Sequence, residues 1–155
     1  MINLFKKSWI PQVLPIMREE DYHTHFIGRT KEGAQFFGYQ TYVFPDGIPE
    51  TDWKKSRKEY VVLYLFDKKG NYLKTNHWYA GTSDQTSDEQ TQSKLQEMVN
   101  ELGEVEYQDI AVKPFQTEID GIEFGLIPDE ETQSIELQPS STIAFFKPWD
   151  GEYDT

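Results

Sequence analysis

Two of the three histidines, His23 and His25, are separated by a single residue. On a strand this spacing would direct both imidazoles to one face, and Asp21 has the same parity. With His77 they would offer three nitrogens and a carboxylate, which are ligands that suit zinc or iron. His-x-His spacing is unspecific, however, and His77 would have to come from another strand. The alternative is that these are partly exposed strand histidines that form local hydrogen bonds.

The sequence contains no recognisable catalytic motif. It has no G-x-S-x-G nucleophile elbow, no H-E-x-x-H and no Walker glycine loop. The absence of cysteine excludes thiolate zinc sites, iron–sulfur clusters and cysteine nucleophiles. The many carboxylates offer too many acid/base pairs for one to be singled out. We therefore expect a non-enzymatic protein with no cofactor, and the alternative is a small metal- or ligand-binding enzyme that uses the three histidines.

A row of carboxylates is predicted on the exposed side of a helix. Glu97, Glu101 and Glu104 have i, i+4, i+7 spacing, opposite the apolar residues of the same segment. Like charges at i, i+4 cost roughly 0.2–0.5 kcal/mol, and carboxylates near a helix C-terminus oppose the helix dipole. Because this row reduces local stability, it is a candidate docking surface, to which Glu106 and Asp109 could contribute. The alternative is an ordinary solvated helix surface.

The net charge of −12 is unevenly distributed. Residues 1–74 contain 12 Lys/Arg and 9 Asp/Glu, whereas residues 75–155 contain 3 and 18. The strongly negative C-terminal half repels phosphate groups, which argues against direct binding of nucleic acid. The same charge would attract a basic protein surface. The oligomeric state does not follow from these numbers.

Two large aromatic residues, Trp149 and Tyr153, surround an Asp-Gly turn in the C-terminal tail, residues 148–155. They could seal the end of a sheet or form a tip that is buried on a partner, so both are partner-binding candidates. At the other end of the chain, residues 1–12 are expected to form a flexible segment.

Most of the elements that must position these residues are predicted to be strands. Residues 59–66 (EYVVLYLF) are apolar on both faces, which predicts a strand in the middle of a sheet. A hairpin of residues 24–29 and 34–44 around a glycine loop is expected before it. A turn-rich connection with the only dense basic cluster lies between the two. Residues 72–80 are expected to return antiparallel to the central strand.

Further strands are predicted over residues 105–113, 115–119, 122–127, 134–137 and 142–146. Asp120-Gly121 is a preferred pair for a two-residue type I′ turn, which would set Ile119 opposite Ile122. The same register sets the like charges of Glu118 and Glu123 opposite each other, which is mildly destabilising.

One amphipathic helix is predicted over about residues 87–102. Ser87 and Gln90 have the spacing of a capping box, and Gly103 is a C-terminal stop. Leu95, Met98, Val99 and Leu102 form one apolar stripe. We therefore expect an α+β fold in which a mostly antiparallel β-sheet built from hairpins carries this helix on one face.

Length and composition indicate a single domain over residues 1–155. Only 37% of the residues are hydrophobic, yet 15% are aromatic, which is unlike a disordered chain. The sequence has no apolar run long enough to span a membrane, and its start lacks the apolar run of a signal peptide. We therefore expect a cytoplasmic protein with no membrane partner.

The chain resembles a bacterial family of small proteins named formate hydrogenlyase regulatory protein, HycA-like. The resemblance rests on short landmarks in a common order: residues 22–29 (YHTHFIGR), 35–37 (QFF), 65–67 (LFD), 78–82 (WYAGT), 107–111 (YQDIA), 119–121 (IDG), 124–126 (FGL), 148–151 (PWDG) and 153–155 (YDT). They extend over nearly the whole chain. The resemblance implies a regulator that represses formate hydrogenlyase genes by opposing their transcriptional activator, and it assigns no catalytic residues.

Taken together, these observations predict a regulatory or protein-interaction domain that presents its acidic C-terminal half to another protein. An immunity-type protein that neutralises a basic toxin is an alternative with the same electrostatics.

Overall fold

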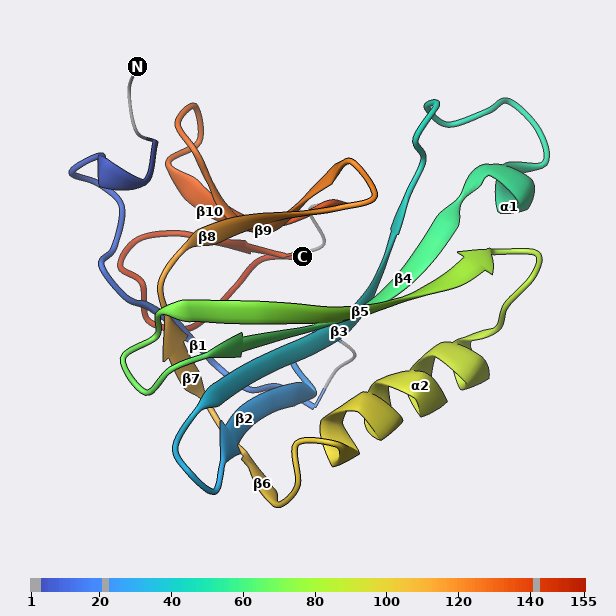
Figure 1. Ribbon diagram of the computed structural model, residues 1–155. Coiled ribbons are helices and arrows are strands. Elements are labelled where there is room, and N and C mark those ends of the chain that lie inside the picture. The colour runs from blue at the N-terminus through green and yellow to red at the C-terminus, as the bar shows by residue number, and fades with distance from the viewer. Residues whose placement is uncertain (1–3, 21–22, 141–142) are drawn as a thin grey trace.

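The chain folds into three layers: a helix, a five-stranded sheet and, on the other face of that sheet, two smaller sheets (Figure 1). The computed structural model describes residues 4–20, 23–140 and 143–155. The expected α+β class, mostly antiparallel sheet with an amphipathic helix on one face, is confirmed, although the strands form three sheets.

The strands are β1 (Leu14–Ile16), β2 (Phe26–Thr30), β3 (Gln35–Val43), β4 (Lys58–Phe66), β5 (Tyr72–Thr82), β6 (Val105–Tyr107), β7 (Ile110–Val112), β8 (Phe115–Ile119), β9 (Ile122–Asp129), β10 (Ser134–Gln138) and β11 (Ala144–Phe145). The helices are the short 3₁₀ helix η1 (Leu4–Lys6), α1 (Trp53–Ser56) and α2 (Asp88–Asn100). Neither described α-helix has the length and hydrophobicity needed to cross a bilayer.

The large sheet has the order β5-β4-β3-β2-β6, and all its pairs are antiparallel. The predicted central strand is confirmed, because β4 lies between β3 and β5. The predicted hairpin is β2–β3, and Gly33 in its turn has a φ of 91°, a conformation that glycine adopts without steric cost. The connection from β3 to β4 contains α1, a four-residue helix that the turn signals did not predict.

The segment 105–113, predicted as one strand, is divided between two sheets. Its first part is β6, which pairs with β2, and its second part is β7, which pairs with β1 in a separate two-stranded sheet. The chain changes sheet at Gln108 and Asp109. There the Gln108 N–H donates to the Ile27 carbonyl, and the Asp109 carboxylate accepts from the Arg18 N–H.

The smaller four-stranded sheet has the order β11-β10-β9-β8. Its β8–β9 hairpin has the predicted register, with Ile119 opposite Ile122 and Glu118 opposite Glu123. Asp120 and Gly121 both have positive φ angles, as a type I′ turn requires. The last strand is shorter than expected, since β11 has two residues, and Thr142 lies outside the described residues.

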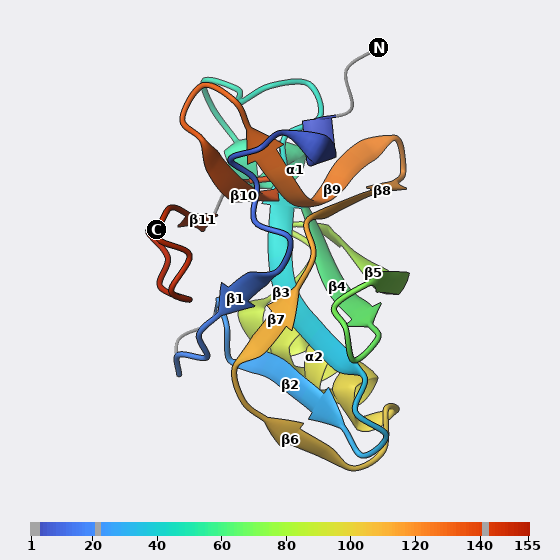
Figure 2. The same cartoon turned by 90° about the vertical axis from the view of Figure 1, so that its left-hand side faces the viewer.

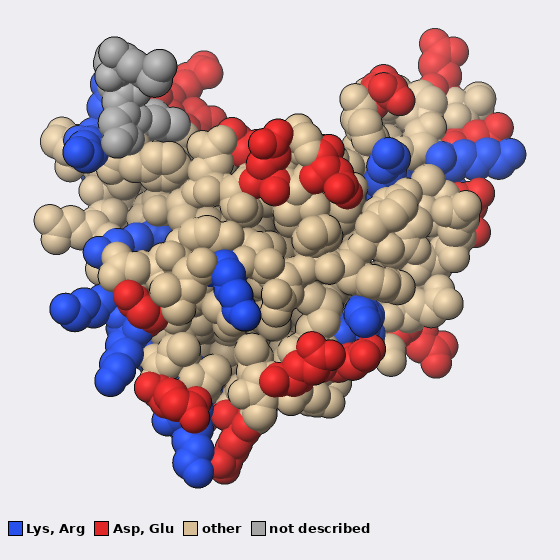
Figure 3. Space-filling view, in the orientation of Figure 1, with Lys and Arg blue, Asp and Glu red and all other residues tan. Residues whose placement is uncertain are grey.

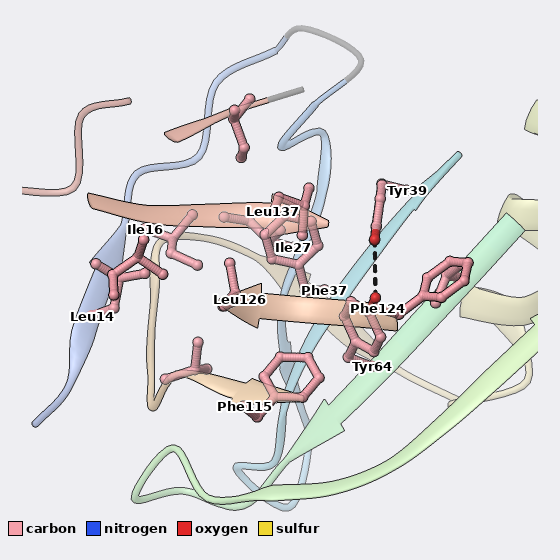
Figure 4. Close-up of a cluster of buried hydrophobic side chains, with 14 of the residues drawn as sticks. Leu14, Ile16, Ile27, Phe37, Tyr39, Tyr64, Phe115, Phe124, Leu126 and Leu137 are labelled. Carbon is pink, nitrogen blue, oxygen red and sulfur yellow. Dashed lines mark hydrogen bonds between the residues drawn. The ribbon is translucent and has the colours of Figure 1, made fainter. Parts of the chain in front are cut away.

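The larger core lies between the five-stranded sheet and the two smaller sheets (Figure 4). Side chains such as Phe37, Phe115 and Leu126 are fully or almost fully buried there. Tyr39 donates its hydroxyl hydrogen to the Gln138 carbonyl at 3.0 Å, so the Tyr64 hydroxyl is the donor in the 2.9 Å bond between the two tyrosines. Burial raises the pKa values of both tyrosines. The core is thus aromatic, with its polar atoms satisfied internally.

The second core lies between the opposite face of the large sheet and α2. Leu95, Met98 and Val99 are buried against β3 and β4, as the predicted stripe requires, and Leu102 is half-buried. The helix begins after Ser87, whose side chain accepts a hydrogen bond from the Gln90 N–H. Because both faces of β3 and β4 are covered, the large sheet is the central layer of the molecule (Figure 2).

Candidate interaction surface

The three carboxylates predicted to form a docking row lie on the solvent side of the helical layer. Glu97 is on α2, Glu101 caps its C-terminus, and Glu104 follows in the loop to β6. Their side chains are exposed, that of Glu97 to 60% and that of Glu104 to 81%. We call these three residues the acidic helix face.

Neutralisation of the acidic helix face by basic groups is incomplete. Glu97 lies 3.5 Å from the Lys94 ammonium, one turn earlier on the same helix, and Glu104 lies 4.0 Å from that of Lys31. Among the described residues, no ion pair involves Glu101. Exposed pairs of this kind contribute only about 0–1 kcal/mol, so the face keeps a negative potential.

The acidic half of the sequence does not form one acidic side of the molecule. Two groups of its exposed carboxylates lie on opposite sides of the large sheet, one on and after α2 and the other on the β8–β9 hairpin, and further ones lie in the β9–β10 turn and in the C-terminal tail. Figure 3 shows acidic side chains over both elements, with the edge of the large sheet between them. A partner could therefore reach either group separately, or both across the sheet edge.

The two aromatic candidates of the C-terminal tail pack against the larger core, on the opposite face of the large sheet from α2. Trp149 and Tyr153 are both half-buried there. The Tyr153 hydroxyl lies 2.7 Å from the Thr24 hydroxyl, and its ring centroid lies 5.7 Å from that of Phe145. The structure therefore does not bring them together with the acidic helix face, and their packing is that of residues that close the end of the core.

The histidines do not form a cluster. His23 and His25 lie in a turn before β2 and not on a strand, so the parity argument for a shared face fails, and Asp21 lies outside the described residues. The His25 ring packs against Phe26 and Tyr107. His77 is on β5, at the far edge of the sheet from β2. Among the described residues, no group of three His, Asp or Glu side chains could hold a metal ion.

The N-terminal segment contributes one core residue. Of residues 1–12 the structure describes 4–12, and Trp9 within them belongs to the larger core. Its indole N–H donates to the Glu130 carboxylate at 3.1 Å.

A pocket that the sequence did not predict lies where α2 begins, between that helix and the ends of β3 and β4. It has a volume of about 450 Å³ and is lined by Gln40, Thr41, Tyr42, Arg57, Glu59, Asp88 and Gln92. The Gln40 side-chain oxygen accepts hydrogen bonds from Thr91 and Gln92 of the helix. The lining contains two carboxylates, Glu59 and Asp88, and one guanidinium, Arg57, so the pocket is also acidic.

Arg57, at the edge of this pocket, lies between two aromatic rings. Its guanidinium carbon is 4.6 Å from the Tyr42 ring centroid and 4.5 Å from that of Trp53, and its Nε donates to the Ser83 hydroxyl at 2.7 Å. In the sequence Arg57 belongs to the basic cluster of the turn-rich connection before residues 59–66. Sequence patterns do not predict this stacking, because Tyr42 lies on β3, far from Arg57 along the chain.

Comparisons with protein-family models, with curated proteins and with solved structures give no match for this chain.

Proposed function

We propose that this chain is a non-enzymatic protein-binding domain whose acidic helix face docks a partner with a basic surface. The observation that supports this most directly is the exposure of Glu97, Glu101 and Glu104 with few basic partners. Glu101 and Glu104 lie at the C-terminal end of α2, where carboxylates oppose the helix dipole. Their presence at a locally unfavourable position is consistent with a role in binding.

Electrostatics of this kind mainly accelerates association and selects the partner. Complementary charge raises association rates above the neutral range of about 10⁵–10⁶ M⁻¹s⁻¹, and salt screens the effect over about 8 Å at physiological ionic strength. The net charge of −12 acts in the same direction and disfavours nucleic acid as the ligand. Binding through this face should therefore be strongly salt-dependent.

Two biological roles fit the same surface. The resemblance to the HycA-like family implies a regulator, which would act by binding a transcriptional activator. An immunity-type protein would instead block the basic, nucleic-acid-binding surface of a toxin. The identity of the captured partner distinguishes the two roles.

The test is a pull-down from lysate of the native host at low and at moderate salt, with bound proteins identified by mass spectrometry. The wild type is compared with Glu97/Glu101/Glu104→Lys. A matched control, Glu20/Glu131/Glu152→Lys, changes the net charge equally at exposed positions outside α2. Circular dichroism verifies that both variants are folded.

We expect a partner that is retained by the wild type and by the control, is released by salt, and is lost with the helix variant. Equal loss with both variants would mean that only net charge matters, and it would contradict a defined docking face. Retention by all three proteins would place the binding site elsewhere.

A further inference from the structure

The strand β5 forms a long, open edge of the large sheet. It has 11 residues and pairs with β4 on one side only, because it is the terminal strand in the sheet order. Figure 1 shows it crossing the front of the molecule between the β8–β9 hairpin and α2, and the turned view of Figure 2 shows it at the right-hand side. Open edges offer unpaired backbone groups to any extended chain, and proteins usually protect them.

The protection of β5 is confined to its ends. The pairing with β4 shifts register next to Tyr60 and next to Phe66, which leaves Ala80 and Leu73 as the extra residues on β5. Between these irregularities, residues 74–79 pair without interruption. β-bulges are a common device that deters edge pairing, so this uninterrupted span is the part of the edge that remains available.

We propose that the β5 edge binds an extended, basic segment of the partner protein as an additional strand. This inference rests on the proposed function, since it describes how the same partner engages the sheet beside the acidic helix face. Main-chain hydrogen bonds along residues 74–79 provide the affinity, and the side chains on either side of the edge provide the specificity.

Acidic side chains lie on the helix side of this edge. Trp78 shares a shallow depression with Glu89 and Glu97 of α2, where the Lys94 ammonium lies 5.7 Å from the Trp78 ring centroid. Lys94 also pairs with Glu97, so one negative charge of this group is left without a basic partner. Lys94 thus already provides a cation over the indole ring, and the Trp78 ring offers apolar surface to an uncharged side chain of a bound strand.

Acidic side chains also lie on the other side of the edge. The Tyr79 ring lies 5.2 Å from that of Tyr60, whose hydroxyl donates to the Asp120 carboxylate at 2.9 Å. Glu118 and Glu123 lie opposite each other on the same hairpin. The described part of β5 itself contributes one cation, Lys74, and no carboxylate. The β8–β9 side of the edge is therefore net negative, whereas on the helix side Lys74 and Lys94 balance the charges of Glu89 and Glu97.

The negative charge of this chain favours binding of a basic strand from another protein over pairing with a second copy of the chain. Antiparallel pairing of two β5 strands would continue the sheet and place both α2 helices on the same face, with their carboxylates adjacent. Two molecules of charge −12 also repel each other at low salt. Successive side chains of a bound strand alternate between the two faces, so Lys or Arg at alternate positions would all face the acidic β8–β9 hairpin, and the uncharged residues between them would face α2.

The test uses three synthetic peptides of 11 residues, the length of β5. The first alternates Lys with Thr and Val, the second has Glu in place of Lys, and the third has the basic sequence interrupted by two prolines. Each is titrated into the full chain at low salt, and amide hydrogen exchange is followed residue by residue with NMR. Sedimentation of the chain alone determines its oligomeric state.

With the basic peptide we expect exchange to slow by at least about tenfold at alternate amides of residues 74–79, the ones that point away from β4. The acidic peptide should have no effect, and the interrupted peptide should bind more weakly. The double variant Glu118/Glu123→Gln should weaken basic-peptide binding more than Glu131/Glu152→Gln, which removes the same charge farther along the chain.

Three results would overturn the strand-addition model. The basic peptide could fail to bind, it could shift α2 resonances without protecting β5, or β5 could be protected by self-association alone. The second result would contradict only this inference, because docking on the acidic helix face would survive. Loss of the lysate partner in the helix variant without peptide protection at β5 would lead to the same conclusion.

Discussion

Leu95 of α2 packs directly on Gly38 of β3. A Cβ atom on Gly38 would lie 2.8 Å from the Leu95 Cδ1 atom and 3.2 Å from the Leu63 Cδ1 atom, both closer than ordinary packing allows. The absence of a side chain at this position thus allows the helix to lie close to the sheet, and the position of the acidic helix face depends on this contact.

We predict that Gly38→Ala destabilises the fold by about 1–3 kcal/mol, because the added methyl group overpacks the helix contact. Leu95→Ala should cost about 2–5 kcal/mol through lost burial. In the double variant the cost of the Gly38 change should shrink, since the methyl group then enters vacated space. Urea denaturation measures all three, and strictly additive costs would show that the two residues do not interact.

Neutralising one carboxylate at each end of α2 should have opposite effects. Glu101→Gln removes a negative charge from the C-terminus and should stabilise the fold by about 0.3–1 kcal/mol. Glu89→Gln removes one from the first turn and should destabilise it by a similar amount. Both residues are exposed, and urea denaturation at low salt resolves the difference. The same sign for both variants would contradict the dipole explanation.

Stability should fall at alkaline pH. Burial raises the pKa values of Tyr39, Tyr64 and Tyr60, and the bond to Asp120 raises that of Tyr60 further. Tyrosines in the unfolded chain ionise near pH 10, so the stability contributed by these groups is complete below about pH 10 and is lost as the pH rises above it. Each group adds a slope of about 1.4 kcal/mol per pH unit.

Tyr64→Phe tests this pH dependence, because Tyr39 keeps the Gln138 carbonyl as its acceptor. Denaturation between pH 8 and 11 should give a shallower loss of stability than in the wild type. Parallel curves for the two proteins would mean that Tyr64 ionises normally in the folded state.

Arg57→Lys should loosen the connection between β3 and β4. The planar guanidinium stacks between Tyr42 and Trp53 and donates to Ser83, and an ammonium cannot reproduce that geometry. We expect faster amide exchange in residues 45–57 and a loss of about 0.5–2 kcal/mol in stability. Lys54→Arg, on a side chain that lies farther from the same ring, is the control and should leave exchange unchanged.

Zinc should not stabilise the chain, because His77 lies at the opposite edge of the sheet from the turn that holds His25. Thermal unfolding with increasing zinc concentration tests this. A melting temperature that rises with zinc and is restored to its metal-free value by His77→Ala would revive the metal hypothesis.

Local signals predicted the local structure well. Asp120-Gly121 was sufficient to give the register of β8–β9, and Ser87 with the apolar stripe was sufficient to place α2, because in both cases the interacting residues are close in sequence. The class of the fold followed from the same elements.

Long-range pairing was the part that sequence patterns could not supply. The segment 105–113 alternates like a single strand, but its halves pair with β2 and β1, which are far away in the chain. The turn that contains His23 and His25 is held by contacts between Thr24 and both Glu19 and Tyr153. The open edge at β5 likewise depends on the order of strands in the sheet, which no single segment specifies.

The pairing of β1 with β7 joins Leu14 to Val112, nearly one hundred residues later. During synthesis at roughly 5–20 residues per second, β1 therefore waits several seconds for its partner strand to be made. β2 waits a comparable time for β6, whereas the β3–β4–β5 meander can form at once. The nascent chain thus exposes both apolar faces of the large sheet before the elements that cover them have been synthesised. A holding chaperone should therefore bind the chain in that interval, and refolding should be slow for a protein of this size.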